Sequence, residues 1–160
     1  MNKIDIVCIG KLKETYLINA MDEYSKRLKS YCKLTIIEQA DEKIHEKMSK
    51  KQEILLKQKE GEKILTKVAD NAFVIALDID GEMLGSVELT RFLEEKANRG
   101  HSHIVFIIGG SLGLCDKVLS RANYKLSFSK MTFPHQLFRV MLIEQIYRVY
   151  KIRLNETYHK

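Results

Sequence analysis

The sequence contains no Asp or Glu between residues 117 and 143, although that window holds five basic residues. Residues 117–160 carry nine Lys or Arg against two acids, a net charge of +7, whereas residues 1–116 are nearly neutral. A concentrated basic surface is the electrostatic signature of a polyanion site. The alternative, a solvated solubilising face, would usually mix both signs. The last quarter of the chain is therefore predicted to bind an anionic partner.

Cysteine and proline are also scarce. The three cysteines, Cys8, Cys32 and Cys115, are widely spaced and include no CxxC pair, so neither a disulfide framework nor a zinc site is indicated. The five histidines form no HExxH pattern, and we expect no metal. One proline leaves no proline-rich linker, so a single domain over residues 1–160 is expected. No apolar run is long enough for a membrane span or a signal-peptide core, which predicts a cytoplasmic protein that does not bind membranes.

Apolar segments alternate with helical patterns along the chain. Strands are predicted at residues 3–10, 33–39, 73–79, 104–108 and, more briefly, 126–128. Helices are predicted at residues 14–28, 49–68, 86–98 and after Pro134. This alternation predicts an α/β fold with a mostly parallel sheet. Ligands of such sheets bind beyond the carboxyl ends of the strands, here Gly10, residues 77–80, Gly109-Gly110 and the loop after Leu126.

Two features in the middle of the chain have local interpretations. Asp80-Gly81 is typical of a turn, which would follow the third strand and precede the helix at residues 86–98. The helix at residues 49–68 mixes charges of both signs with few apolar positions, so its charge is interpreted as a solvated face.

The segment from Gly109 to Gly113 follows a strand and resembles a nucleotide-binding turn, because glycine lets backbone approach a ligand closely. It does not match the dinucleotide fingerprint, since Ser111 and Leu114 occupy the second and third glycine positions. The acid that would bind a ribose about 20 residues further on is absent. The Gly-Lys-Ser/Thr ending of a Walker-type phosphate loop is absent as well. A glycine turn that serves only tight packing is the alternative.

The last helix is apolar on almost every side after Pro134. Thr132 is a candidate cap, and proline suits a first turn. At 100° per residue the polar positions fall into one stripe, formed by Glu144, Gln145 and Arg148. A helix with so little polar surface is buried, and we predict that a second subunit covers it, which makes a homodimer.

His135 and Arg139 share the apolar side of that helix, so both are candidates to reach the ligand cleft or to cross the dimer interface. The alternatives are structural. His135 would then be a plain helix-entry residue, and Arg139 would pair with Glu144 or with a backbone carbonyl.

Four segments carry a resemblance to a known family: IGKLKETY at the start, IGGSLGL at a strand end, the stretch that contains PHQ, and the terminal YHK. With them the chain resembles, over essentially its whole length, the bacterial ribosomal RNA large subunit methyltransferase H family of the SPOUT superfamily. The resemblance implies an α/β fold with a deep trefoil knot near the C-terminal end, a homodimer, and S-adenosylmethionine bound in the knot. The implied reaction is N3-methylation of pseudouridine 1915 in helix 69 of 23S ribosomal RNA, on the large subunit or the assembled 70S ribosome.

The resemblance also implies site residues. The expected cofactor contacts are Leu77, Gly109, Gly110, Phe128, Ser129, Lys130, Met131, Thr132 and Phe133. The residues expected to face RNA are Lys130, Arg139, Arg153 and Lys160. Methylation of a ring nitrogen requires removal of its proton or stabilisation of the resulting anion. The candidates for this chemistry are His135, Arg139, Tyr158 and His159.

Two other functions compete with methyl transfer. A non-catalytic RNA-binding module of the ribosome-assembly type would explain the basic tail but not the glycine turn. A nucleotide-dependent enzyme of ordinary doubly wound fold is disfavoured by the missing acid and the broken glycine spacing.

Overall fold

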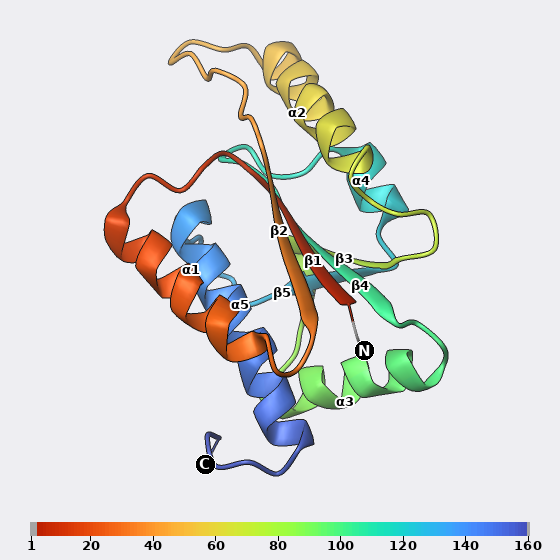
Figure 1. Cartoon of the computed structure of the whole chain (residues 1–160). Coiled ribbons are helices and arrows are strands. Elements are labelled where there is room, and N and C mark those ends of the chain that lie inside the picture. The colour runs from red at the N-terminus through yellow and green to blue at the C-terminus, as the bar shows by residue number, and fades with distance from the viewer. Residues whose placement is uncertain (1–2, 160) are drawn as a thin grey trace.

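The structure is a computed structural model that describes residues 3–159. Five strands form one parallel sheet in the order β2-β1-β4-β3-β5 (Figure 1). The strands are β1 (Lys3–Ile9), β2 (Lys33–Gln39), β3 (Phe73–Met83), β4 (His103–Ile108) and β5 (Tyr124–Ser127). The helices are α1 (Thr15–Leu28), α2 (Lys50–Leu65), α3 (Ser86–Asn98), α4 (Asp116–Arg121) and α5 (His135–Arg153). The predicted α/β fold with a mostly parallel sheet is confirmed.

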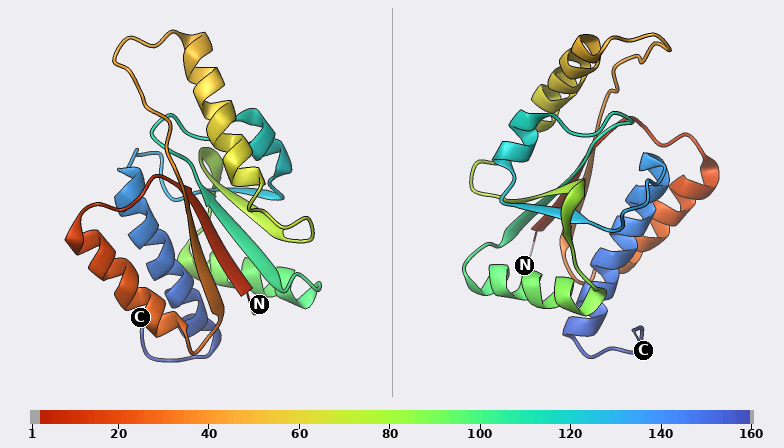
Figure 2. Two further views of the ribbon diagram at one scale, coloured as in Figure 1. Left: turned by 45° about the horizontal axis from the view of Figure 1, so that its top comes forward. Right: turned by 180° about the vertical axis from the view of Figure 1, so that it is seen from behind.

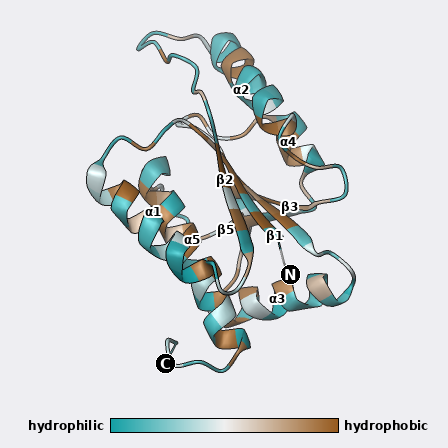
Figure 3. Cartoon of the chain, in the orientation of Figure 1, coloured by the Kyte–Doolittle hydropathy of each residue, from teal (hydrophilic) through white to brown (hydrophobic). Residues whose placement is uncertain are grey.

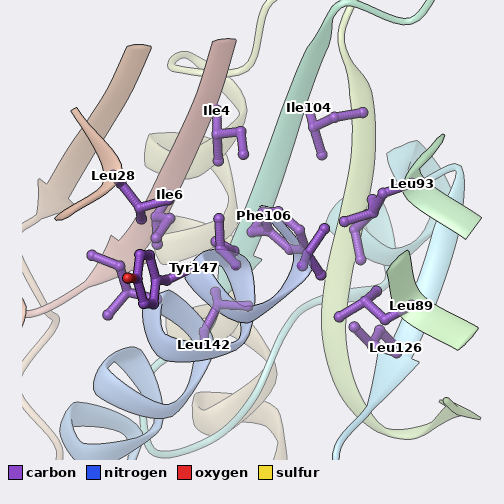
Figure 4. Close-up of a cluster of buried hydrophobic side chains, with 14 of the residues drawn as sticks. Ile4, Ile6, Leu28, Leu89, Leu93, Ile104, Phe106, Leu126, Leu142 and Tyr147 are labelled. Atoms are coloured by element: carbon purple, nitrogen blue, oxygen red, sulfur yellow. The ribbon is translucent and has the colours of Figure 1, made fainter. Parts of the chain in front are cut away.

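The helices cover both faces of the sheet (Figure 2). One core cluster joins the sheet to α1, α3 and α5, through side chains such as Leu28, Leu93 and Leu142 (Figure 4). The other joins the opposite face to α2 and α4, through Ile64 and Val118. The central strands β1 and β4 are therefore buried on both faces, which explains why their sequences are mostly apolar (Figure 3). Asp5 in β1 is a buried exception, and it pairs with His103 of β4.

The course of β3 corrects one expectation. Leu77 and Glu82 both pair with Leu126 of β5, so residues 78–81 form a bulge opposite a single partner residue. Asp80-Gly81 lies within this bulge, and the strand continues to Met83 instead of ending in a turn. A β-carbon on Gly81 would lie 2.7 Å from the Lys125 carbonyl oxygen. Glycine is therefore required there by close backbone approach.

Two further differences lie in the last third of the chain. The six-residue helix α4 was not predicted, and it packs Val118 against the sheet. Helix α5 begins at His135 with Pro134 in the N-cap position, and no side chain caps it, so Thr132 is not the cap. The polar stripe on α5 is confirmed, because Glu144 accepts hydrogen bonds from both Gln145 and Arg148.

Candidate functional site

A cavity of about 160 Å³ opens at the carboxyl edge of the sheet, beyond β3, β4 and β5. Eight of the nine expected cofactor residues line it: Leu77, Gly109, Gly110, Phe128, Ser129, Met131, Thr132 and Phe133. Lys130 belongs to the same loop but is exposed and does not line the cavity. Because parallel strands present their carboxyl ends at one edge, three separate segments of the sequence meet there.

The bulge in β3 adds residues that sequence reasoning did not single out. Asp78 and Ile79 line the cavity at the point where the strand leaves its pairing with β5. Asp78 is half-buried and forms no ion pair with any residue from 3 to 159. Its carboxylate is therefore free to face a cationic ligand. An acid just after the buried part of a strand was the available sequence signal, but the bulge that places Asp78 at the cavity depends on pairing with β5.

A β-carbon added to Gly109 or Gly110 would point toward other atoms of the protein and not into the cavity. At Gly109 that atom would lie 2.9 Å from the Gly113 carbonyl carbon. At Gly110 it would lie 3.1 Å from Glu60 Oε2 and 3.2 Å from Ile9 Cγ2. Tight packing, the alternative considered for these two glycines, is thus part of their role. Gly113 differs, since it lines the cavity, has φ +82° and would place a β-carbon in open space.

The Gly110 geometry makes a prediction about stability. A graded series, Gly110→Ala and then Gly110→Val, is expected to lower the free energy of unfolding progressively, by about 1–3 kcal/mol for valine. The cause is overpacking against Glu60 and Ile9. Denaturant unfolding measures the loss. In a double-mutant cycle, Glu60→Ala should relieve part of the valine penalty. A Gly110→Val protein of unchanged stability that no longer binds cofactor would contradict this account.

Glu60 holds the segment before α2 beside the glycine turn. It is buried, its Oε1 accepts a hydrogen bond from the backbone N–H of Glu42, and its Oε2 has no partner among the described residues. Burial raises the pKa of this carboxyl above its ordinary value. The carboxyl couples α2 to the turn at Gly110, a role that the sequence alone did not suggest.

His135 is the candidate catalytic residue that lines this cavity. It is half-buried at the start of α5. Burial, and then the nearby positive charge of Arg139, lower the pKa of its imidazole below the ordinary value. The ring is therefore neutral at physiological pH and can accept a proton.

Arg139 lies elsewhere, which corrects the expectation that it reaches the ligand cleft. Its side chain is 1% exposed. Nη1 donates to Glu38 Oε2 at 2.8 Å, and Nη2 donates to the carbonyl oxygens of Ile9 and Gly10 at 2.5 and 2.8 Å. The structural alternative, pairing with a carbonyl, describes this arrangement, although the acidic partner is Glu38 and not Glu144. A side chain held in this way ties the start of α5 to the ends of β1 and β2.

Tyr158 and His159 do not line this cavity, because the chain after α5 folds back along the second half of that helix. The Tyr158 hydroxyl donates to Glu144 Oε1 at 3.0 Å, and its ring packs edge-on against Tyr147. The Nδ1 atom of His159 is 3.2 Å from Arg148 Nη1. Through residue 159 the C-terminal segment is thus anchored to α5. Burial, followed by hydrogen bonding, raises the pKa of Tyr158, so the phenol stays protonated.

The residues expected to face RNA do not form one cluster. Lys130 is exposed beside the cavity. Arg153 is at the far end of α5 and pairs with Glu94 at 3.3 Å, and Arg139 is buried. Lys160 lies outside the described residues. Within one protomer, Lys130 is therefore the member of this set that stands next to the cavity.

A larger cavity, of about 430 Å³, lies between α3 and α5. It shares Leu126 and Phe128 with the first cavity, and it is bordered by Val140, Met141 and Glu144 of α5. No residue expected to bind cofactor other than Phe128 lines it. We therefore place the candidate cofactor site in the smaller cavity, where the independent motifs converge.

Two kinds of feature are not found in the part of the chain that the structure describes. No group of three or more His, Cys, Asp or Glu side chains is arranged to hold a metal ion. No helix between residues 3 and 159 combines the length and the apolar character needed to cross a membrane.

Comparison with known proteins gives matches over nearly the whole chain. A family model described as a predicted SPOUT methyltransferase matches residues 2–159. The chain is 59% identical to the ribosomal RNA large subunit methyltransferase H of Clostridium acetobutylicum. It is 60% identical to the protein of that name from Clostridium novyi and 59% identical to that from Clostridium tetani. Each alignment spans 157 residues, or 98% of this chain and 99% of the relative.

Proposed function

The chain belongs to the SPOUT methyltransferase family, and from that premise we propose that it methylates large-subunit ribosomal RNA with S-adenosylmethionine as methyl donor. The proposed target atom is N3 of pseudouridine 1915 in helix 69 of 23S ribosomal RNA, as the sequence resemblance implies. One observation carries the proposal. Eight residues that motif matching assigned to the cofactor surround a single cavity at the ligand-binding edge of the sheet. The family assignment also fits the expected trefoil knot.

The residues around the cavity suit this cofactor. Phe128, Phe133 and Phe138 offer apolar surface for an adenine ring, and the loop of residues 128–133 offers main-chain groups for its polar edge. Gly113 leaves open space in front of its backbone. The Asp78 carboxylate supplies negative charge for the positive sulfonium and ammonium groups. When bound, S-adenosylmethionine supplies an electrophilic methyl group.

The chain must also handle the proton on the target nitrogen. We propose that neutral His135, at the cavity, is placed to accept it. Tyr158 stays protonated, because burial raises the pKa of its phenol. Turned away from Glu144, to which it now donates, the hydroxyl can stabilise negative charge on a neighbouring carbonyl oxygen. His159 is exposed beside it and offers a second polar group to RNA.

His135 begins α5, whereas the chain after α5 folds back so that Tyr158 donates to Glu144, nine residues along the helix. At 1.5 Å rise per residue, Glu144 lies about 14 Å from His135 along the helix axis. We propose that a second copy of the chain contributes Tyr158 and His159, which removes this separation. A homodimer in which α5 helices run antiparallel would bring Tyr158 and His159 of one protomer to the cavity of the other. Such an interface would also cover Leu137, which is 40% exposed.

Asp78 gives a test of the cofactor assignment. Asp78→Asn is expected to weaken S-adenosylmethionine binding about three- to tenfold, because one close charge pair near a protein surface is worth about 1 kcal/mol or somewhat more. Binding of S-adenosylhomocysteine, which lacks the sulfonium charge, should change less. Calorimetry with both ligands measures the difference. The control is Asp80→Asn, two residues away and outside the cavity lining. Equal losses for the two ligands would assign Asp78 to the ammonium group that both carry, and no loss for either ligand would remove Asp78 from this role.

Mass spectrometry of ribosomal RNA tests the proposed function in cells. Deletion of the protein should remove one methyl group from a pseudouridine-containing fragment of 23S ribosomal RNA, and re-expression should restore it. An unchanged methylation pattern, together with ribosome binding but no binding of S-adenosylmethionine at millimolar concentration, would favour the non-catalytic RNA-binding module.

A further inference from the structure

Helix α2 and the segment before it carry cationic charge that the candidate site does not use. Residues 43–59, which we call the lysine arm, hold six lysines against Glu46 and Glu53. The lysines are Lys43, Lys47, Lys50, Lys51, Lys57 and Lys59. Among the described residues none of the six lies within ion-pair distance of a carboxylate. Lys63, further along α2, shows the contrast, because it pairs with Glu42 at 2.7 Å.

The lysine arm includes the first turns of α2, which are capped but contain almost no buried side chains. Ser49 and Gln52 form a capping box, in which each side chain bonds the backbone N–H of the other residue. No residue between 50 and 55 is buried; the buried positions of α2 are Leu56, Glu60, Gly61 and Ile64. The first half of α2 projects away from the sheet with the loop before it (Figure 1). Local capping, and not packing, thus holds this end of the helix.

The position of the lysine arm links it to the candidate site. Glu60, the next residue, lies against Gly110 of the cavity. From there the arm extends outward, and Lys50 lies about 15 Å along the helix axis from Glu60. Lys43, His45 and Lys59 line a groove between α2 and the preceding segment, together with two acids, Asp41 and Glu42, at its inner end. A nucleic acid with one base in the cavity would have flanking phosphates within reach of this surface.

We infer that the lysine arm is a second contact surface for the phosphate backbone of ribosomal RNA, separate from the basic C-terminal quarter of the chain. The inference rests on the proposed function, and it replaces the interpretation of α2 as a merely solvated face. Binding of phosphates by unpaired, exposed lysines is favourable because it releases the counterions condensed on the RNA. Because these lysines contact phosphates and not base edges, the arm contributes affinity and orientation, not sequence selectivity.

An anionic membrane surface is the competing partner, because Ile44, Ile54 and Leu55 are each about half exposed. A membrane-bound helix needs a continuous apolar face opposite its charges. At 100° per residue, Lys51 falls between Ile54 and Leu55 on the outward side of α2, so the apolar surface is interrupted by charge. This arrangement favours RNA over lipid.

The test uses a quadruple variant, Lys43→Ala, Lys50→Ala, Lys51→Ala and Lys59→Ala. The control is a double variant, Lys29→Ala and Lys33→Ala, which removes exposed lysines outside the lysine arm. Lys29 and Lys33 are exposed and lie at the amino edge of the sheet, away from the cavity. Alanine keeps the helix propensity of lysine positions, so α2 should remain folded. Circular dichroism and S-adenosylmethionine calorimetry check that fold and cofactor site are intact in both.

The quadruple variant is expected to bind 70S ribosomes at least about tenfold more weakly, with a salt slope reduced by up to about one unit for each lysine that contacts a phosphate. Where methyl transfer is measured, KM for ribosomes should rise and kcat should stay within about twofold. The lost contacts stabilise the ribosome complex equally before and during methyl transfer, so the rate of the chemical step should not change. The control should behave as the unmodified protein.

Ribosome binding by the quadruple variant equal to that of the control would overturn the inference. So would unchanged ribosome binding together with lysine-dependent binding of the unmodified protein to phosphatidylserine vesicles. Absence of methyl transfer by the unmodified protein would overturn the proposed function instead, and the binding measurement would still decide the role of the lysine arm.

Discussion

Removal of residues 158–160 is expected to lower turnover of methyl transfer on 70S ribosomes at least about tenfold, since positioned proton-transfer groups typically contribute about a hundredfold or more. The physical reason is the loss of Tyr158 and His159, a protonated phenol and an imidazole that lie near the polar stripe of α5. Binding of S-adenosylmethionine should be retained, since neither Tyr158 nor His159 lines the cofactor cavity. Single-turnover kinetics measure the effect apart from product release.

The anchoring of Tyr158 means that this truncation needs a structural control. Tyr158→Phe keeps the ring against Tyr147 but removes the hydrogen bond to Glu144. A rate loss for Tyr158→Phe with an unchanged melting temperature would assign the effect to the hydroxyl. Normal turnover of the truncated protein would shift the catalytic role to His135.

A mixing experiment tests whether two protomers share one site. The truncated chain is combined with a Leu77→Trp chain, in which the larger side chain fills the cavity. If each protomer completes the other's site, mixed dimers hold one intact site, and random assortment should restore about a quarter of full activity. No recovery, with mixed dimers verified by mass spectrometry, would contradict the shared site.

Arg139→Ala is expected to lower the free energy of unfolding by about 3 kcal/mol, the size typical of breaking a buried, hydrogen-bonded charge pair. The substitution leaves the carbonyl oxygens of Ile9 and Gly10 without their donor and opens a cavity beneath α5. Glu38 is 33% exposed, so water can solvate its carboxylate and limit the loss. Chemical denaturation measures the change.

Arg153→Ala is the matched control on the same helix. Its ion pair with Glu94 is solvent-exposed, so its loss should cost less than about 1 kcal/mol. A stable Arg139→Ala protein with impaired ribosome binding would show that Arg139 contacts RNA after all, and would overturn its assignment as a positioning residue.

The parts of this fold that could be predicted from sequence are those set by local pattern. Strands β1 and β4 are mostly apolar because both of their faces are covered, and α1 and α3 repeat apolar positions at helical spacing. Helix α4 was missed because six residues are too few to show a period. The bulge in β3 was missed because it is defined by pairing with β5, more than forty residues away in sequence.

The candidate site divides in the same way. Its location was predictable, since the carboxyl ends of parallel strands meet at one edge whatever the details of the loops. The partners of Arg139 were not, because Glu38 and the carbonyls of Ile9 and Gly10 lie 101 or more residues away in the chain. Likewise, no sequence pattern reveals that a β-carbon on Gly110 would face Glu60 instead of a ligand.

Transfer of a labelled methyl group tests the central claim most directly. The purified protein is incubated with S-adenosylmethionine carrying an isotopically labelled methyl group and with 70S ribosomes from cells that lack the protein. The account predicts one labelled methyl group per ribosome, at N3 of a single pseudouridine in 23S ribosomal RNA, as located by mass spectrometry of nuclease fragments. Label on another nucleotide would contradict the proposed target, and no label on ribosomes by a protein that binds the cofactor would contradict the proposed function.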